Sequence, residues 1–200
     1  MKLASCALQL RCAASRAKKT ALPALWLVSD GVRSGDLRAA LRRLPKGSGF
    51  IFRHYEMQGR ENYARELRHL CRQRRILFLV AGDWRLAHKI RADGVHLPEV
   101  LTDQARAIKA RQPRMIITVA AHGGCALRRA YLSGADAGLL SPVFPTRSHP
   151  GAPALGAVHF AGLVRHSPLP VIALGGIDAS NVRRLRASGA IGVAGVSGVA

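Results

Sequence analysis

Residues 134–156 bring hydroxyl, guanidinium and imidazole side chains together in one proline-rich segment. An apolar run ends at Leu140, and Pro142 prevents it from continuing as a helix. The polar groups of this segment follow directly: Thr146, Arg147, Ser148 and His149. Irregular segments of this length inside a compact domain are usually lids or binding loops rather than plain connections. The segment therefore predicts a loop that holds a ligand.

Two glycine-rich turns near the end of the sequence have the composition of a phosphate cradle. Gly175 and Gly176 follow one apolar run, and Val196 and Ser197 lie in a second turn that follows another. Because glycine has no Cβ, the backbone N–H groups of such turns can approach an anion closely. A tight turn alone would also demand glycine, so this structural alternative stays open.

Arg53 and Asp83 each follow a short apolar run. A guanidinium near the end of a buried strand needs an anion or a carboxylate beside it. Arg53 is therefore expected either to bind an anionic ligand or to form an internal ion pair with Asp83 or Asp93. Asp83 itself is expected either to cap the helix that follows or to ligate a metal ion.

Two histidines also lie at the predicted strand ends. His96 has the position of a core histidine whose ring is satisfied by a buried hydrogen bond, whereas His122 precedes a Gly-Gly pair and is expected to be more accessible. An accessible histidine can take up and release a proton near neutral pH, so His122 is the candidate for proton transfer.

Eight short apolar runs alternate with segments whose apolar residues recur at helical spacing. We expect strands at residues 24–29, 49–53, 76–80, 94–97, 115–119, 135–140, 170–174 and 191–194. After the seventh run, Asp178 is expected to cap a helix that carries Val182 and Leu185. This alternation is typical of a single-domain α/β protein, a TIM (β/α)₈ barrel, with a doubly wound open sheet as the alternative. Barrel enzymes bind substrate at the carboxyl ends of the strands, where the polar residues above lie.

Composition restricts the class of protein further. The chain of 200 residues is 48% hydrophobic and carries a formal charge of +20, a balance that attracts anions. Aromatic residues make up only 5%, which disfavours nucleic acid as a partner and leaves arginines on exposed helix faces as the simpler interpretation. No apolar run approaches the roughly 20 residues needed to span a bilayer. The four cysteines show no metal-binding spacing, which is consistent with reduced thiols in the cytoplasm.

The sequence divides into two parts by charge. Residues 1–22 contain basic residues and no acid, and are expected to form a basic N-terminal extension or a helix. Residues 23–200 hold all eight expected strands and form the barrel. The oligomeric state stays open between monomer and homodimer.

Four segments resemble the thiamine phosphate synthase/TenI family: ADGVHL, TVAAH, SPVFPTRSHPGAPALG and VIALGGID. The similarity extends over most of the chain from Leu25 onward. It implies a (β/α)₈ barrel of thiamine biosynthesis. Synthases of this family join an aminopyrimidine pyrophosphate to a thiazole phosphate with Mg²⁺, and the TenI branch includes thiazole tautomerases.

The resemblance assigns roles to the residues that match the family pattern. It implies that Arg53 and Thr146 bind pyrophosphate, with Ser148 and His149 in the same loop, and that Asp83 ligates Mg²⁺. It implies that the thiazole phosphate is bound by a second set: Gly175, Gly176, Val196 and Ser197.

The match is partial on the pyrophosphate side. Tyr55 and His149 stand where synthases carry lysines, and Leu101 stands at the position of the second acidic Mg²⁺ ligand. Mg²⁺ requires hard oxygen ligands, so losing one of two acids weakens the metal site. The lost lysines also remove charge that would stabilise a departing pyrophosphate.

The resemblance thus implies a divergent thiamine phosphate synthase, a cytoplasmic transferase that acts on phosphorylated small molecules. A TenI-type isomerase that uses His122 and needs no metal is the first alternative. A non-catalytic barrel that senses a phosphorylated ligand is the second, and an RNA-associated protein attracted by charge alone is the third.

Overall fold

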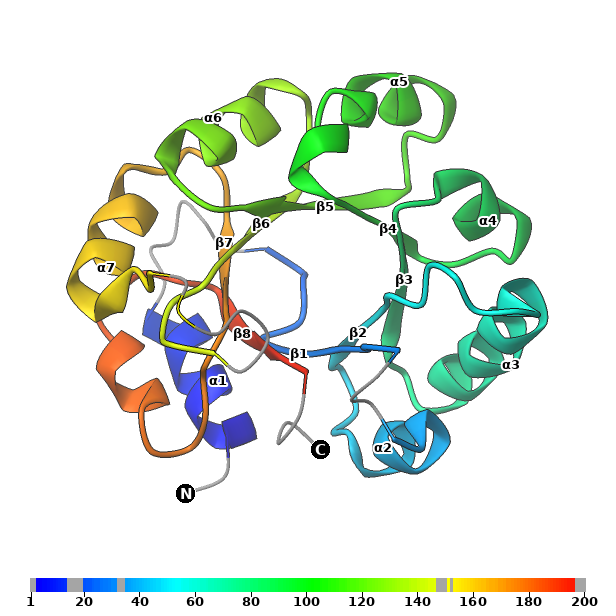
Figure 1. Ribbon diagram of the computed structural model, residues 1–200, viewed down its shortest axis with the longest axis horizontal. Coiled ribbons are helices and arrows are strands. Elements are labelled where there is room, and N and C mark those ends of the chain that lie inside the picture. The colour runs from blue at the N-terminus through cyan, green and yellow to red at the C-terminus, as the bar shows by residue number, and fades with distance from the viewer. Residues whose placement is uncertain (1–2, 14–19, 32–34, 147–150, 152, 197–200) are drawn as a thin grey trace.

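The chain forms a closed barrel of parallel strands paired in sequence order, with β8 returning to β1 (Figure 1). The computed structural model describes residues 3–13, 20–31, 35–146, 151 and 153–196. The strands are β1 (Leu25–Val28), β2 (Gly49–Phe52), β3 (Leu77–Ala81), β4 (Gly94–Leu97), β5 (Ile116–Ala121), β6 (Ala137–Leu140), β7 (Val171–Leu174) and β8 (Gly192–Gly195). The closed barrel confirms the predicted TIM barrel and excludes the open sheet.

Helices surround the barrel and cover its outer surface (Figure 1). The α-helices are α1 (Leu3–Ala13), α2 (Leu37–Arg43), α3 (Arg60–Gln73), α4 (Trp84–Lys89), α5 (Gln104–Arg111), α6 (Gly124–Leu132) and α7 (Gly156–His166). Among the described residues, short 3₁₀ helices also lie in the ring: η2 (Glu99–Leu101) and η3 (Val182–Leu185).

The expectation that Asp178 caps a helix after β7 is wrong. Its Oδ1 accepts hydrogen bonds from the N–H groups of Ser180 and Asn181, at 2.8 and 3.1 Å, and so closes a tight turn. The segment that carries Val182 and Leu185 then forms the 3₁₀ helix η3 instead of an α-helix. Aspartate competes well for nearby backbone N–H groups, which stabilises turns as readily as helix starts.

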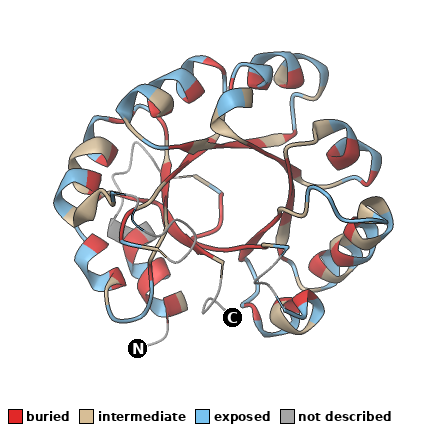
Figure 2. Cartoon of the chain, in the orientation of Figure 1, coloured by how far each residue is buried: buried red, intermediate tan, exposed pale blue. Residues whose placement is uncertain are grey.

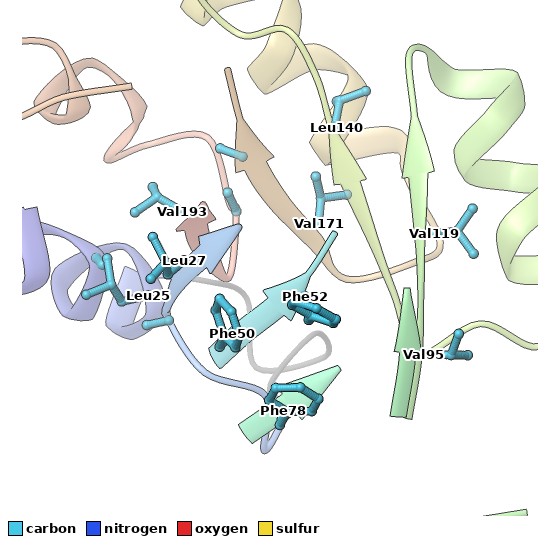
Figure 3. Packing of buried hydrophobic residues seen from close by; sticks show 14 of the residues in the cluster. Leu25, Leu27, Phe50, Phe52, Phe78, Val95, Val119, Leu140, Val171 and Val193 are labelled. Carbon is cyan, nitrogen blue, oxygen red and sulfur yellow. The ribbon is translucent and has the colours of Figure 1, made fainter. Parts of the chain in front are cut away.

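Side chains along the strands alternate between an outer apolar layer and the barrel interior. Those that point outward, including Phe50, Phe78 and Val119, pack beneath the helices (Figure 3). Burial of each such side chain contributes about 1.5–3 kcal/mol to folding. The burial pattern follows this division, since the strands are buried and the outer helix faces are exposed (Figure 2).

The barrel interior is filled at its amino-terminal end. The indole of Trp26 occupies the space above Gly49, where an added Cβ would lie 2.2 Å from the indole ring. The Trp26 Nε1–H group donates a 2.7 Å hydrogen bond to the Pro23 carbonyl, so the buried ring leaves no unpaired donor. Ile51 and Leu79 continue the same inner layer.

Helix α1 packs against β8, β1 and η3, at the seam where the barrel closes (Figure 1). Leu3, Cys6 and Leu10 are buried in this contact. The Arg186 guanidinium also donates a 2.6 Å hydrogen bond to the Gln9 side chain. A helix from the beginning of the chain thus covers the side of β8 that the expected strand–helix pattern leaves bare.

Within the described ranges, none of the helices is both long and apolar enough to cross a membrane.

Candidate functional site

The candidate residues converge because each follows a strand of the same parallel barrel. Arg53, Asp83, His122, Gly175 and Val196 come directly or almost directly after β2, β3, β5, β7 and β8. The carboxyl ends of all eight strands lie at one end of a parallel barrel, so these groups share one opening. We call this opening the carboxyl mouth.

Arg53 is held in the carboxyl mouth by Asp30. The guanidinium Nη2 lies 2.7 Å from the Asp30 carboxylate, and the two side chains are 34% and 13% exposed. The Arg53 backbone N–H also donates to the Ser29 hydroxyl at 2.8 Å. Neither acid expected to pair with Arg53 does so, because β2 lies beside β1 and brings the end of β1 next to Arg53.

The same Ser29 hydroxyl lies 3.0 Å from Nδ1 of His54, whose ring stacks on Phe52. Burial lowers the pKa of His54, opposed by the Asp30 carboxylate, and the Arg53 charge adds to the lowering. His54 is therefore a neutral support for the ion pair.

A second cation in the carboxyl mouth, Arg60, was not predicted from the sequence. Its guanidinium donates a 2.7 Å hydrogen bond to the Ala81 carbonyl and lies 3.8 Å from the Asp83 carboxylate. The carbon of the guanidinium also lies over the rings of Phe52 and Tyr55, at 5.9 and 5.7 Å from their centroids. An arginine at the first position of a helix is unfavourable next to the positive end of the helix dipole. This unfavourable position is the one feature of the sequence that could have indicated a special role for Arg60.

Tyr55 lies beyond the end of β2 and packs beside the residue that follows β3. Its ring occupies the space beside Gly82, where an added Cβ would lie 2.8 Å from the ring. Burial raises the pKa of the Tyr55 phenol, and nearby Arg53 and Arg60 lower it. A neutral phenol thus stands where synthases of the family carry lysine, with Arg60 beside it.

Asp83 acts as the N-cap of α4. Its Oδ1 accepts a 2.9 Å hydrogen bond from the Leu86 N–H group, as the helix-capping alternative expected. Leu101 lies in the 3₁₀ helix η2 and offers no oxygen ligand. In the part of the chain that the structure describes, no group of three histidine, cysteine or acidic side chains could hold a metal ion.

His96 is a core residue rather than a ligand-binding group. It lies in β4, points to the barrel interior, and its Nδ1 is 2.9 Å from the hydroxyl of Thr118. Burial lowers the pKa of His96 to about 4, and the charge of Arg53 adds to the shift. The ring is therefore neutral at physiological pH, as expected for a satisfied core histidine.

His122 is exposed at the end of β5 and its ring orientation is fixed. Nδ1 lies 2.9 Å from the carbonyl oxygen of Ser141, which can only accept, so Nδ1 carries the proton of the neutral ring. The His122 backbone N–H group also donates to the Glu99 carboxylate at 3.1 Å. In this tautomer Nε2 keeps its lone pair, the form that a proton-accepting base requires.

The glycines after β7 adopt left-handed conformations, with φ of +98° at Gly175 and +63° at Gly176. A Cβ on Gly175 would lie 2.8 Å from the Cα atom of Pro142, and one on Gly176 would lie 2.3 Å from the Pro145 carbonyl oxygen. Close packing of the loop after β6 therefore explains these glycines without any ligand.

The backbone donors at the same corner nevertheless have no acceptor among the residues that the structure describes. The carbonyl groups of Gly175 and Gly176 accept hydrogen bonds from Phe144 N–H and Asn181 Nδ2. None of the described residues accepts a hydrogen bond from the N–H groups of Gly175, Gly176 or Val196. Three unpaired amide donors on two neighbouring strand ends are suited to bind an anion.

The loop after β6 is described only in part. Thr146 is half-buried at the end of the described segment, whereas Ser148, His149 and Ser197 lie outside the described residues. Their predicted roles stay predictions. The loop before them is fixed to β7, since Val143 N–H donates to the Leu174 carbonyl at 3.0 Å.

Comparison with known proteins places this geometry in a family. Residues 26–199 match the family TMP-TENI, described as thiamine monophosphate synthase. The thiamine-phosphate synthase of Geobacillus thermodenitrificans is 36% identical over 78% of this chain and 69% of its own length. The thiamine-phosphate synthase of Bacillus velezensis is 30% identical over 90% of this chain and 84% of its own length.

A solved structure agrees with these sequence relatives. The thiamine phosphate pyrophosphorylase from Pyrococcus furiosus superposes with a TM-score of 0.72 at 26% identity. The superposition covers 87% of this chain and 85% of that protein. The likeness therefore extends over the whole barrel and is not limited to one motif.

Proposed function

The chain belongs to the thiamine monophosphate synthase (TMP-TENI) family, and from this premise we propose that it is a divergent thiamine phosphate synthase. In this role it joins an aminopyrimidine pyrophosphate to a thiazole phosphate. The proposal assigns it phosphorylated small molecules as partners and the cytoplasm as its location. A homodimer is compatible with the proposal and is not required by it.

The observation that carries the proposal is the division of the carboxyl mouth into two anion-binding halves. Arg53 and Arg60 supply fixed positive charge beyond β2 and β3. Gly175, Gly176 and Val196 supply unpaired amide donors beyond β7 and β8. A synthase must bind a pyrophosphate and a phosphate at once, and these halves match that requirement.

The proposed roles follow from what each group can donate. Arg53, oriented by Asp30, contacts the departing pyrophosphate with the N–H groups that the ion pair leaves unused. Thr146 closes over the same group from the loop after β6. The amide donors of Gly175 and Gly176 orient the thiazole phosphate, together with Val196 and the predicted Ser197. Donors that are already fixed when negative charge develops lower the barrier most effectively.

The Mg²⁺ that the family resemblance implies does not fit this chain as a protein-held ion. Asp83 is the one acid at the expected positions, and its Oδ1 already caps α4. Leu101 provides no second carboxylate. Because Mg²⁺ needs several hard oxygen ligands, we assign no step of the reaction to the ion.

The direct test combines the purified chain with both substrates and measures thiamine phosphate, with Mg²⁺ or with EDTA. We expect product above the no-enzyme blank, and we expect Arg53→Ala to reduce its formation. Arg165→Ala is the matched control, because it removes an exposed arginine of α7 that has no place in the carboxyl mouth. Product no higher than the blank in both conditions would refute the synthase.

A second candidate function rests on the tautomer of His122. With Nδ1–H bound to the Ser141 carbonyl, Nε2 is ready to accept a proton, as a TenI-type thiazole tautomerase requires. We expect isomerisation of the thiazole carboxylate phosphate to survive EDTA and to disappear in His122→Ala. Unchanged turnover in that variant would exclude His122 as the base. Binding of thiazole phosphate without either reaction would instead indicate the non-catalytic barrel.

A further inference from the structure

A second cleft opens at the opposite end of the barrel from the carboxyl mouth. Its volume is about 720 Å³, and Leu77, Met115 and Ile116 at the amino-terminal ends of β3 and β5 form its apolar floor. Helices α4 and α5 are neighbours in the ring of helices outside the barrel (Figure 1). Their carboxyl-terminal ends and the residues that follow supply the polar lining of the cleft: His88, Lys89, Arg91, Gln112 and Arg114.

Two of these cations are not neutralised. Arg91 and Arg114 are exposed, and neither forms an ion pair or a side-chain hydrogen bond with any residue that the structure describes. Asp93, the one acid in the lining, is engaged elsewhere: its Oδ1 lies 3.0 Å from the Arg68 guanidinium and its Oδ2 accepts from Phe78 N–H at 2.7 Å. The cleft therefore carries an uncompensated positive charge.

The backbone at Arg91 allows its side chain to be removed without strain. Arg91 follows α4 with φ of +54°, a left-handed conformation that glycine adopts readily and branched-Cβ or long side chains adopt reluctantly. Arg75 follows α3 in the same conformation. Glycine would suit the backbone at both positions better than arginine does.

The size and lining of the cleft define the class of ligand. A volume of this order fits a small molecule, whose typical pockets measure about 300–1,000 Å³. Guanidinium groups match the paired oxygens of phosphate, and the apolar floor suits a carbon-bearing part of the ligand. The lining has no phenylalanine, tyrosine or tryptophan on which nucleic-acid bases could stack, and the imidazole of His88 is its one aromatic ring.

We infer that this cleft is a second anion site, which binds a phosphate-bearing small molecule at the amino-terminal end of the barrel. Arg91 and Arg114 contact the phosphate oxygens from two sides, and the Gln112 amide donates to the same group. The site is independent of the proposed synthase reaction, since none of its residues reaches the carboxyl mouth.

The test is a titration of the full chain with inorganic pyrophosphate, followed by the backbone amide NMR signals. We expect the signals of Arg91, Asp93 and Gln112 to shift together and to saturate. Arg91→Gly should weaken this binding about tenfold, the effect of losing one charge-assisted contact. Arg75→Gly is the matched control, because it removes the same charge from the same conformation outside the cleft, and it should change the affinity less than about twofold.

Arg91→Gly allows a clear reading because glycine suits a left-handed residue, so loss of binding does not reflect loss of folding. If Arg75→Gly weakened pyrophosphate binding as much as Arg91→Gly does, the binding would reflect the general positive charge of the protein rather than a site, and the inference would be overturned. The absence of saturable shifts at the cleft up to about 10 mM pyrophosphate would also overturn it. Pyrophosphate that binds in the carboxyl mouth is detected by shifts of a different set of amide signals, those of Gly175 and Gly176. Those shifts test the proposed function and not this inference.

Discussion

The two ends of the barrel carry positive charge in different ways. In the carboxyl mouth, Arg53 is paired with Asp30, and Arg60 is held by a carbonyl group and two aromatic rings. At the amino-terminal end, the side chains of Arg91 and Arg114 form no ion pair or hydrogen bond with any described residue.

The difference separates two uses of arginine. A guanidinium held by neighbours keeps one position, and its remaining donors are ready when charge develops during a reaction. A guanidinium without neighbours keeps its side-chain freedom and must lose it when a ligand binds, which weakens binding. We therefore expect substitutions in the carboxyl mouth to change the reaction rate. Substitutions in the opposite cleft should change only the affinity for the anion bound there.

The largest expected effect is that of Arg53→Ala on the synthase reaction. Loss of a fixed donor from the departing pyrophosphate should lower the rate about 10²–10³-fold, measured as thiamine phosphate formed per unit time. Asp30→Asn keeps the arginine but loosens it, and should cost about tenfold. Rates within about threefold of the unchanged chain in both variants would show that the ion pair is structural only.

The pH dependence of stability comes next, through His96. Its pKa of about 4 in the folded chain lies below the ordinary value of about 6.5 for an unfolded chain. As the pH falls from about 6.5 to about 4, the unfolded chain binds a proton that the folded chain does not, so the free energy of unfolding decreases by about 3 kcal/mol. This contribution is fully present above pH 6.5.

Urea unfolding at pH 4, 5.5 and 7 measures this loss. Carboxylates also titrate in part of the range, so His96→Gln is the control, and the fall in stability should be smaller in that variant by about the same 3 kcal/mol. In Arg53→Ala the pKa of His96 should move upward, because the nearby charge is gone. Identical pH profiles for the unchanged chain and His96→Gln would contradict a neutral buried ring.

Glycine substitutions compare the two ends directly. Gly176→Ala combines a left-handed residue with a Cβ 2.3 Å from the Pro145 carbonyl, and should destabilise by about 2–4 kcal/mol. Gly47→Ala at the amino-terminal end has a φ of +78° and open space around it, and should cost only about 1 kcal/mol. Equal losses in urea unfolding would mean that the loop after β6 moves aside freely.

The smallest effects are expected for Arg75→Gly and Arg91→Gly. Glycine relieves the left-handed strain but adds freedom to the unfolded chain, so the free energy of unfolding should stay equal or rise by up to about 1 kcal/mol. Urea unfolding of both variants checks this. A loss above about 1 kcal/mol in either would show that the arginine stem packs against the barrel.

The sequence predicted the barrel because most strands are buried on both faces and therefore read as uninterrupted apolar runs, as at residues 76–80 and 170–174. It was wrong about the helix after Asp178, because the same carboxylate–backbone contact starts turns and helices alike. The local sequence pattern predicts where a strand or helix lies better than it predicts whether a short segment forms an α-helix, a 3₁₀ helix or a turn.

The site was predicted only where a residue is informative by itself. Gly175 and Gly176 could be placed from their type, but the partner of Arg53 could not, because strand pairing alone brings Asp30 beside it. Arg60 and the cleft at Arg91 were not predicted for a similar reason. Because the chain has many arginines, only the fold distinguishes those that are fixed by neighbouring residues or that line one cleft from those that simply face solvent.

The packing of α1 on β8 has a consequence for how the protein is made. Leu3, Cys6 and Leu10 are synthesised before every strand of the barrel, whereas β8, which helps to bury them, is synthesised after the seven other strands. Until then β1 is the one contact of α1 that has already been synthesised, so part of the apolar face of α1 stays exposed on the nascent chain. Closure of the barrel between β8 and β1 should therefore be the last step of folding.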